Sequence, residues 1–344
     1  MPTTDILITG ATGRIGANIA KHMVELGHNV RALVLPDDPE VEKISSLGIE
    51  PISGDITSFE DVRRSVDGVN VVFHLGAAFQ AGGPFTPEQY MQANVQATFH
   101  IFEAARERGA GLRQVVFSST DATLDKYPVG GNTKLINETN TTQMQTDWYG
   151  FSKILGERIA DRFVRADRLP VTVVRFPMVW GAGEFLQFEQ FRLAYFVEKF
   201  EARNDVVSRD TYSRLCAQVA DDDSLVVALD ANGRSWMKHT LDVRDISDAF
   251  EQLLGNECVI GNTYQLGAPS PFSWAEVVPA IAGATGERVV EVRLAGIVPT
   301  FYEFDLSAAR RDFGYTPSHG WESTLAEAIR YTTTGRTDIV PTRL

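Results

Sequence analysis

Cysteine and histidine are scarce in this chain of 344 residues, and acidic residues outnumber basic ones. The two cysteines, Cys216 and Cys258, cannot build a disulfide framework, and no cysteine or histidine pair has the spacing of a zinc site, so we expect no bound metal. Lysine and arginine number 32 against 45 acidic residues, which gives a formal net charge of −13. Because nucleic acids and anionic membranes bind basic surfaces, we expect neither as a partner.

Long hydrophobic runs are also absent. No apolar stretch approaches the ~20 residues that cross a bilayer, and a strand pattern begins already near Ile6, which leaves no room for a signal peptide. We therefore expect a cytoplasmic protein. Hydrophobic residues make up 44% and charged residues 22% of the chain, which is typical of a globular protein with ample core for one large domain or two joined ones.

The stretch from Ile6 to Gly16 carries the first positive signal. Branched apolar residues run directly into three glycines, and apolar residues then recur at helical spacing as far as Leu26. A strand, a glycine turn and a helix begin a dinucleotide-binding fold, in which glycines let the backbone approach a pyrophosphate and the helix start stabilises its charge. A purely structural glycine turn is the alternative. The cofactor contacts predicted here are Gly10, Thr12, Gly13, Arg14, Ile15 and Gly16.

The second predicted strand, residues 29–35, bears on the choice between NAD and NADP. An acidic residue at its end would bind the ribose hydroxyls of NAD, whereas a basic residue would suit the 2′-phosphate of NADP. Asp37 lies slightly later than expected, and no cation follows the strand. We expect NAD, with NADP as the open alternative because Arg14 could serve a phosphate.

Strand and helix patterns alternate through the first 177 residues and then weaken. Further strands are predicted at residues 49–56, 69–75, 114–117 and 171–176, and an aromatic-rich helix at 185–200. The alternation is typical of an α/β fold with a Rossmann-type, doubly wound parallel sheet. We expect a dinucleotide-binding domain at 1–177, to which 233–265 returns, and a smaller C-terminal substrate-binding lobe formed by 178–232 and 266–340.

Two polar residues lie in apolar patterns. His74 belongs to the predicted strand 69–75, and we expect a packed core residue rather than a catalytic one. Asn94 lies on the apolar stripe of a helix predicted at 87–108. It either bridges backbone groups or belongs to the active site, and its position favours neither.

Tyr149 and Lys153 form the candidate catalytic pair. They are four residues apart at the start of a predicted helix, so their side chains share one face. A tyrosine acts as a general acid or base when its pKa falls, and a neighbouring ammonium with a positively charged nicotinamide would lower it. The strand at 114–117 delivers Ser119 and Thr120 to the carboxyl edge of the sheet, where ligands bind. One of these hydroxyls could hold the substrate oxygen.

These motifs resemble those of the extended short-chain dehydrogenase/reductase family, which includes NAD-dependent sugar epimerases and dehydratases. The resemblance covers nearly the whole chain. It rests on residues 9–16, 54–56, 74–78, 94–98, 117–120, 149–153, 175–181 and 241–246.

The resemblance implies roles for particular residues. Thr120, Tyr149 and Lys153 would form the catalytic group, and Lys153 would also bind the nicotinamide ribose. The cofactor would further contact Asp55, Ile56, Leu75, Gly76, Ala77, Asn94, Ser118, Phe176 and Val179. The substrate would contact Phe79, Thr120, Met178 and Lys238. The helices around Asn94 and Lys153 would form the interface of a homodimer, as in many relatives.

Three departures from the family pattern bear on the substrate. Nucleotide-sugar enzymes usually carry Asn where this chain has Met178 and Arg near Lys238, and both normally help to hold the diphosphate. The dehydratase glutamate expected after Asp121 is Ala122, so elimination by an Asp/Glu pair is not expected. The stretch 200–230, which shapes the substrate pocket in this family, matches no pattern.

The sequence therefore predicts an NAD(P)-dependent oxidoreductase that transfers hydride at a secondary alcohol or ketone of a carbohydrate-like small molecule, with nucleotide-sugar epimerisation as one form. A simple dehydrogenase or reductase acting on a free sugar or other small carbonyl compound is the alternative, favoured by Met178 and Lys238. A non-catalytic nucleotide sensor is the alternative of another class. The Tyr149–Lys153 pair argues against the sensor.

Overall fold

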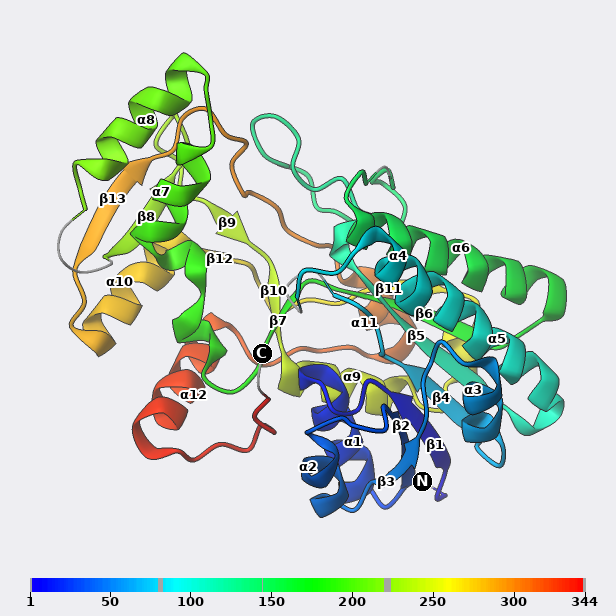
Figure 1. The fold of residues 1–344 in the computed structure, drawn as a ribbon. Coiled ribbons are helices and arrows are strands. Elements are labelled where there is room, and N and C mark those ends of the chain that lie inside the picture. Colours follow the sequence, from blue (N-terminus) through cyan, green and yellow to red (C-terminus); the bar gives the residue numbers. More distant parts are fainter. Residues whose placement is uncertain (1, 80–82, 144, 220–223, 343–344) are drawn as a thin grey trace.

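A seven-stranded sheet organises the protein in a computed structural model that describes residues 2–79, 83–143, 145–219 and 224–342 (Figure 1). The strand order is β11-β6-β5-β4-β1-β2-β3, and every neighbouring pair is parallel. The strands are β1 (Asp5–Thr9), β2 (Asn29–Val34), β3 (Glu50–Ser53), β4 (Val71–His74), β5 (Gln114–Thr120), β6 (Val171–Phe176) and β11 (Thr263–Gln265). The order reverses between β1 and β4, which confirms the predicted doubly wound Rossmann-type sheet.

Helices cover both faces of the sheet because its strands are apolar on both sides. Ile6 and Ile8 pack into one hydrophobic cluster and Leu7 into another, as alternation along a strand requires. On the first face lie α1 (Arg14–Glu25), α2 (Val41–Ser46), α9 (Val243–Leu253) and α11 (Ser307–Phe313). On the second lie α3 (Phe59–Val66), α5 (Ala97–Arg108) and α6 (Trp148–Asp167).

The predicted helix at 87–108 is continuous but changes its winding. It begins as α4 (Pro87–Tyr90), passes through a π-helical segment at Met91–Gln96 and continues as α5. Segments of π-helix are frequent at functional sites because the wider turn re-aims side chains. Here the π-helical segment contains the buried Asn94.

Aromatic side chains form much of the hydrophobic cluster of the second lobe. The helices and short strands of this lobe lie beside the central sheet (Figure 1). The strands outside the central sheet are β7 (Met178–Trp180), β8 (Leu225–Leu229), β9 (Met237–Lys238), β10 (Thr240–Asp242), β12 (Phe272–Ser273) and β13 (Val289–Arg293). They pair as β10-β7, β12-β9 and β13-β8. The helices are α7 (Leu193–Glu201), α8 (Val206–Cys216), α10 (Trp274–Thr285) and α12 (Trp321–Thr334). The unassigned stretch 200–230 thus supplies α8 and β8, and its residues 220–223 lie outside the described part.

The predicted aromatic helix at 185–200 is wrong in its first half. Two short 3₁₀ turns, Glu184–Gln187 and Glu189–Phe191, come before α7. Phe185 lies in the first of these turns and Phe188, which is extended, lies between the two. Both rings pack edge-on against Trp180, with ring centroids 5.0 and 5.1 Å away.

Segments from the second half of the chain return to the first core. Strand β11 pairs with β6, α9 packs on α1, and aromatic residues from Tyr302 to Tyr315 join the same hydrophobic cluster. The domain division stays a prediction, but residues 302–315 pack with the first domain rather than the lobe. No helix within the described ranges is long and apolar enough to cross a bilayer.

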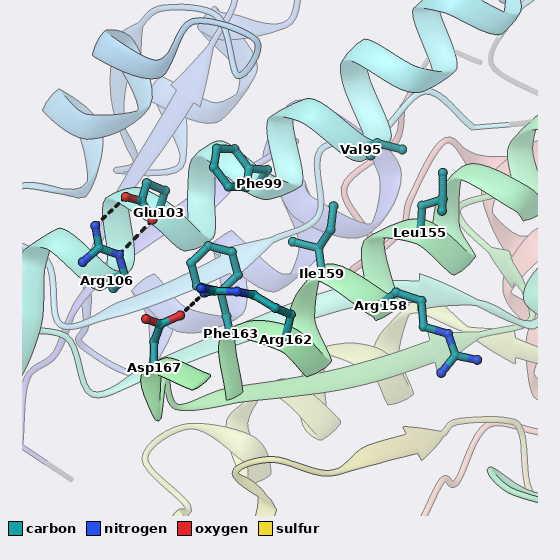
Figure 2. Close-up of a pocket in the computed structure, with 10 residues that line it drawn as sticks. All are labelled: Val95, Phe99, Glu103, Arg106, Leu155, Arg158, Ile159, Arg162, Phe163 and Asp167. Carbon is teal, nitrogen blue, oxygen red and sulfur yellow. Dashed lines mark hydrogen bonds and ion pairs between the residues drawn. The ribbon is translucent and has the colours of Figure 1, made fainter. Parts of the chain in front are cut away.

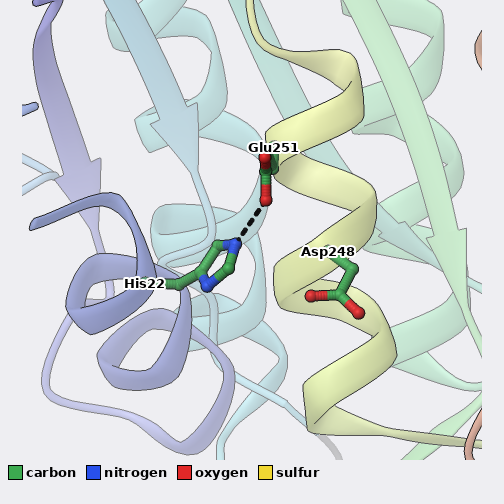
Figure 3. Close-up of side chains that lie close together, drawn as sticks. All are labelled: His22, Asp248 and Glu251. Atoms are coloured by element: carbon green, nitrogen blue, oxygen red, sulfur yellow. Dashed lines mark hydrogen bonds and ion pairs between the residues drawn. The ribbon is translucent and has the colours of Figure 1, made fainter. Parts of the chain in front are cut away.

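Three polar side chains gather at the contact of α1 with α9 (Figure 3). His22 Nε2 and Glu251 Oε2 are 2.8 Å apart, and Asp248 lies beside them, so that one ligand atom of each lies within 4.8 Å of the others. Exposed carboxylates commonly gather without an ion, and we assign no metal to this cluster.

Candidate active site

The predicted site residues converge on one edge of the sheet. The carboxyl ends of β1, β4, β5 and β6 are neighbours in the strand order, and the segments that follow them carry most of these residues. Ser118 and Phe176 are buried near the ends of β5 and β6, Ile15 is half-buried at the start of α1, and Ala77 is half-buried in the loop after β4. Asp55 and Ile56 follow β3 at the far side, where Asp55 Oδ1 accepts a hydrogen bond from the Thr57 amide at 2.7 Å. Their contact with adenine stays a prediction.

The glycine turn after β1 leaves no room for side chains. A Cβ on Gly10, whose φ is +71°, would lie 2.8 Å from the Gly76 nitrogen, and a Cβ on Gly16 would lie 2.1 Å from the Gly10 oxygen. Thr9 Oγ1 accepts hydrogen bonds from the amides of Leu75 and Gly76 at 3.1 and 3.0 Å, which fixes the loop after β4 against the turn. Gly10 and Gly16 therefore let the backbone segments of this site pack directly against each other.

The start of α1 is free to bind an anion. Its N-cap, Gly13, supplies no side-chain hydrogen bond, and the first turn contains no acidic residue. The first amides of a helix without such partners favour a negatively charged ligand. This cradle fits a dinucleotide diphosphate, as the sequence predicts.

Gly16→Ala tests this close approach. The added methyl group must push the Gly10 carbonyl aside, so we expect a loss of NAD affinity and a destabilisation of about 1–3 kcal/mol. The control is Gly283→Ala, because Gly283 lies within α10 and a Cβ added there would meet nothing within 4 Å. That helical substitution should be neutral or stabilise by roughly 0.5–1 kcal/mol. Calorimetric NAD titration and thermal unfolding measure both effects, and equal results for the two variants would contradict the packing argument.

Arg14 points towards the second lobe. Its Nη1 donates to the Val179 carbonyl at 2.5 Å, and its Nε lies 2.9 Å from Glu184 Oε1. Burial lowers the pKa of Arg14 and raises that of Glu184. The structure thus brings Arg14 and Val179 together, while contact of Arg14 with a phosphate stays a prediction.

Two polar residues beside the glycine turn, on the side predicted to bind adenosine, are not identified by the sequence pattern. Asp38, rather than Asp37, faces the glycine turn, and its Oδ2 accepts a hydrogen bond from Thr12 Oγ1 at 2.7 Å. Lys43 reaches the same turn from α2 and donates to the Thr12 carbonyl at 2.9 Å. No cation follows β2 directly in the sequence, but α2 brings Lys43 to the glycine turn. Lys43 is paired with Glu40 at 2.9 Å, which partly offsets its charge.

His74 is a core residue, as expected. It is 1% exposed, its Nδ1 accepts from Thr9 Oγ1 at 2.8 Å, and its Nε2 lies 3.1 Å from Thr98 Oγ1. Because Thr98 Oγ1 donates to the Asn94 carbonyl, the imidazole donates through Nε2 and is neutral. Burial, and then the charge of Lys153, lower its pKa to about 3.

Asn94 bridges two segments, so the first of its two predicted roles is the one the structure shows. Its Oδ1 accepts from the Ala78 amide, and its Nδ2 donates to the Ala78 carbonyl, both at 2.8 Å. Nδ2 also donates to Ser152 Oγ at 2.9 Å. Asn94 therefore joins the loop after β4 to α6, and its predicted contact with the cofactor stays untested.

Tyr149 and Lys153 lie on the first two turns of α6. The helix begins there because Asp147 accepts a hydrogen bond from the Gly150 amide at 2.8 Å. The Thr120 side chain at the end of β5 lies near enough to the Tyr149 hydroxyl to act on its pKa. The Lys153 ammonium lies 4.5 Å from the centroid of the Phe117 ring.

The pKa values of the catalytic pair move in opposite directions. Burial raises the pKa of Tyr149 to about 12, although the Thr120 side chain acts to lower it. Burial lowers the pKa of Lys153 to about 8, and the Glu157 carboxylate opposes this change. Without cofactor, burial dominates the pKa of Tyr149, and its lowering by the ammonium together with a charged nicotinamide stays a prediction.

The glycine turn, the Tyr149–Lys153 pair and the doubly wound sheet occur together in a known family. The sequence model of the NAD dependent epimerase/dehydratase family matches residues 6–267. The chain belongs to this family. Membership confirms the resemblance to extended short-chain dehydrogenase/reductase proteins and the expectation of NAD as cofactor.

Individual relatives of this epimerase/dehydratase chain carry several activities. It is 24% identical to a 3-beta-hydroxysteroid dehydrogenase of Mycolicibacterium neoaurum, with 95% of this chain and 91% of the relative covered. It is 28% identical to a UDP-glucose 4-epimerase of Streptomyces lividans, with 94% of each covered. A short-chain dehydrogenase/reductase superfamily structure from Agrobacterium tumefaciens, solved with bound NAD, superposes with a TM-score of 0.81 at 24% identity, covering 96% of this chain and 98% of that one.

In this family member the acid beside Thr120, Asp121, is held in an ion pair. The Asp121 carboxylate is buried, and its Oδ2 lies 2.5 Å from Lys126 Nζ. The Lys126 ammonium also lies 5.3 Å from the centroid of the Tyr302 ring. Because Asp121 is held in an ion pair and Ala122 follows it, the side chains agree with the expectation that no Asp/Glu pair performs elimination.

Met178 and Lys238, the two predicted substrate residues that depart from the family pattern, contact each other. Lys238 Nζ lies 3.8 Å from Met178 Sδ and 4.8 Å from the centroid of the Phe188 ring. Burial and the charge of Lys126 lower the pKa of Lys238 to about 7. Phe79, the fourth predicted substrate residue, is 40% exposed at the end of the loop after β4.

Proposed function

We propose that the protein transfers hydride between NAD and a carbon atom that carries a secondary hydroxyl or keto group. The placement of Tyr149 and Thr120 carries this proposal, because Thr120 ends β5 at the carboxyl edge of the sheet and its side chain acts on the Tyr149 hydroxyl, which sets an acid/base group beside an orienting hydroxyl. Lys153 follows one turn later on the same face of α6. A nucleotide sensor would need the glycine turn but not this arrangement.

Each group has a role in proton movement. In the oxidative direction the Tyr149 oxygen takes the hydroxyl proton of the substrate, and in reduction it returns a proton to the ketone oxygen. Thr120 Oγ1 hydrogen-bonds with that oxygen, and Lys153 donates to the nicotinamide ribose and stabilises the phenolate. NAD, when bound, supplies the hydride acceptor and a positive charge near the phenol. The phenol is protonated at neutral pH in the chain alone, so formation of the phenolate requires that added charge.

The side chains at the predicted substrate positions favour a dehydrogenase or reductase that acts on a small hydroxy or keto compound. A thioether and a lysine packed on an aromatic ring occupy the two positions where nucleotide-sugar relatives hold the diphosphate. Beside Tyr149, the Tyr90 ring lies 6.2 Å away between centroids, and the Phe85 ring lies 5.7 Å from Tyr90. Nucleotide-sugar epimerisation is the second candidate, favoured by the similarity to the Streptomyces lividans epimerase.

An absorbance assay at about 340 nm, where reduced nicotinamide absorbs, separates these candidates. Purified protein and NAD are mixed in turn with a 3β-hydroxysteroid, a free sugar and UDP-glucose, and Tyr149→Phe is run in parallel. The proposal predicts net NADH with a substrate that lacks a diphosphate and none with the variant. Product from UDP-glucose without net NADH would instead establish an epimerase. If no substrate class is turned over, the non-catalytic nucleotide sensor becomes the favoured function.

We also propose that the protein is a homodimer whose interface is formed by α5 and α6, and that it is cytoplasmic. The two helices line an apolar groove that includes Val95, Phe99, Leu155 and Ile159, with charged residues at its end (Figure 2). Phe99 is 45% exposed although it is a large apolar side chain. Two copies of this face would bury the groove through a two-fold contact.

Phe99→Glu is expected to convert the dimer into a monomer, because it places a charge in the centre of the contact. Light scattering after size-exclusion chromatography measures the mass. Val206→Glu is the control, since Val206 is 83% exposed on α8, away from this groove. A wild-type protein that is monomeric at all concentrations would contradict the proposed interface.

A further inference from the structure

A buried ion pair lies one helical turn beyond Lys153, and the proposed mechanism does not use it. Arg175 donates from Nε to Glu157 Oε1 at 2.8 Å and from Nη2 to Glu157 Oε2 at 2.7 Å. The side chains are only 6% and 8% exposed. A two-pronged contact of this kind fixes both position and orientation of the carboxylate.

Two further donors complete the surroundings of Glu157. Ser119 Oγ on β5 donates to Oε1 at 2.5 Å, and Gln143 Nε2 in the loop before α6 donates to Oε2. Each carboxylate oxygen thus accepts two hydrogen bonds. These donors, together with the adjacent positive charge, keep the pKa of Glu157 below its usual range despite burial. The carboxylate is therefore charged at neutral pH.

This negative charge acts on Lys153. The two residues are four apart on α6, so they share a face of the helix. Burial alone drives the Lys153 ammonium towards its neutral form, and Glu157 provides the opposing attraction. The ammonium has no carboxylate within ion-pair distance among the described residues, and it lies against an aromatic ring.

We propose that Glu157 is a positioning residue for Lys153: its carboxylate, fixed by Arg175, Ser119 and Gln143, keeps the ammonium charged in the pH range where the enzyme works. This inference rests on the proposed function for its catalytic meaning. The electrostatic relation between the two side chains is independent of any substrate. Ser119, whose hydroxyl is one of two candidates for holding the substrate oxygen, serves this network instead.

The decisive experiment neutralises the two partners separately. Glu157→Gln keeps the shape but removes the attraction and leaves Arg175 positive, so the midpoint for Lys153 deprotonation should fall by about one pH unit. Arg175→Met removes the positive charge and leaves Glu157 with the hydrogen bonds of Ser119 and Gln143, so the midpoint should rise. The double variant, with neither charge, should return towards wild type. A purely structural role would disturb both single variants in the same direction.

Two readouts report the midpoint. In the first, NADH affinity is measured across a range of pH. Its fall at alkaline pH reports the loss of the Lys153 charge in the presence of cofactor. In the second, the 13C chemical shift of the Lys153 Cε is followed against pH in cofactor-free protein. Its signal is identified as the one that is absent from Lys153→Arg. This second readout needs no activity, so it stands even where the proposed function fails. Asp230→Asn is the matched control, because it neutralises a buried carboxylate that pairs with Arg234 in the second lobe.

The outcomes are distinct. Opposite shifts in the single variants, with an unchanged midpoint in the control, support the positioning role. Unchanged midpoints, or shifts in one direction only, overturn it. Where Glu157→Gln alone does not fold, Arg175→Met is compared with the double variant, because these two differ only in the charge of residue 157. A higher midpoint in Arg175→Met is then the supporting result, and equal midpoints are the contradicting one.

Discussion

Replacing Tyr149 with phenylalanine is expected to lower kcat by about 10²–10⁴-fold, the usual contribution of a positioned general acid or base. The variant loses one hydroxyl, which lies near Thr120, while the ring keeps its packing against Tyr90. NAD affinity should therefore be nearly unchanged. Steady-state kinetics and calorimetric NAD titration measure the two effects separately.

The control for this substitution is Tyr195→Phe. Tyr195 lies on α7 in the second lobe, where its hydroxyl accepts a hydrogen bond from Lys199 at 3.2 Å. Removing that hydroxyl should leave kcat close to wild type. Wild-type kcat in Tyr149→Phe itself would sink the proposed mechanism, whatever the control shows.

Replacing Lys153 with methionine should weaken both NAD binding and turnover. The proposed role of the ammonium is to donate to the cofactor ribose, and a hydrogen bond from a charged group contributes about 1.5–3 kcal/mol, or roughly tenfold or more in Kd. Its removal also takes away the charge that stabilises the phenolate. Lys153→Arg, which keeps a charge, should retain more affinity. An unchanged Kd together with an unchanged kcat in the methionine variant would place the active site elsewhere.

The pH dependence of NAD binding follows from the same residue. Burial lowers the pKa of Lys153 to about 8, so the ammonium is present below that pH and lost above it. Wild-type affinity should accordingly fall as the pH rises through about 8. The Lys153→Met variant has no ammonium at this position to lose a proton. Its weaker NAD binding should therefore not fall further as the pH rises through about 8.

The regular part of the fold could be predicted because its signals are local. Ile6 to Gly16 and the alternation of strands and helices depend on periodicity and turn residues within short windows. The same local rules failed at 185–200, where aromatic packing across the second lobe selected 3₁₀ turns over a helix. Tertiary packing outweighed the helical pattern.

The candidate site could be predicted in part. Tyr149, Lys153 and Thr120 follow recognisable spacing and strand ends, and the structure brings Thr120 near enough to Tyr149 to act on its pKa. The ion pairs of Arg14 with Glu184 and of Glu157 with Arg175 join residues that are far apart in the sequence. No periodicity encodes such contacts. The Glu157 position four residues after Lys153 was the one available signal.

The most direct test of the central claim is a measurement of NAD on the purified protein. Protein prepared without added cofactor is denatured, any released nucleotide is identified by mass and absorbance, and cofactor-free protein is titrated with NAD and NADP. The account predicts one NAD site per chain, with an affinity that Gly16→Ala lowers. NAD that is retained through purification points to the epimerase. NAD that exchanges freely points to the dehydrogenase. A correctly folded protein that carries no nucleotide and binds neither cofactor would contradict the account.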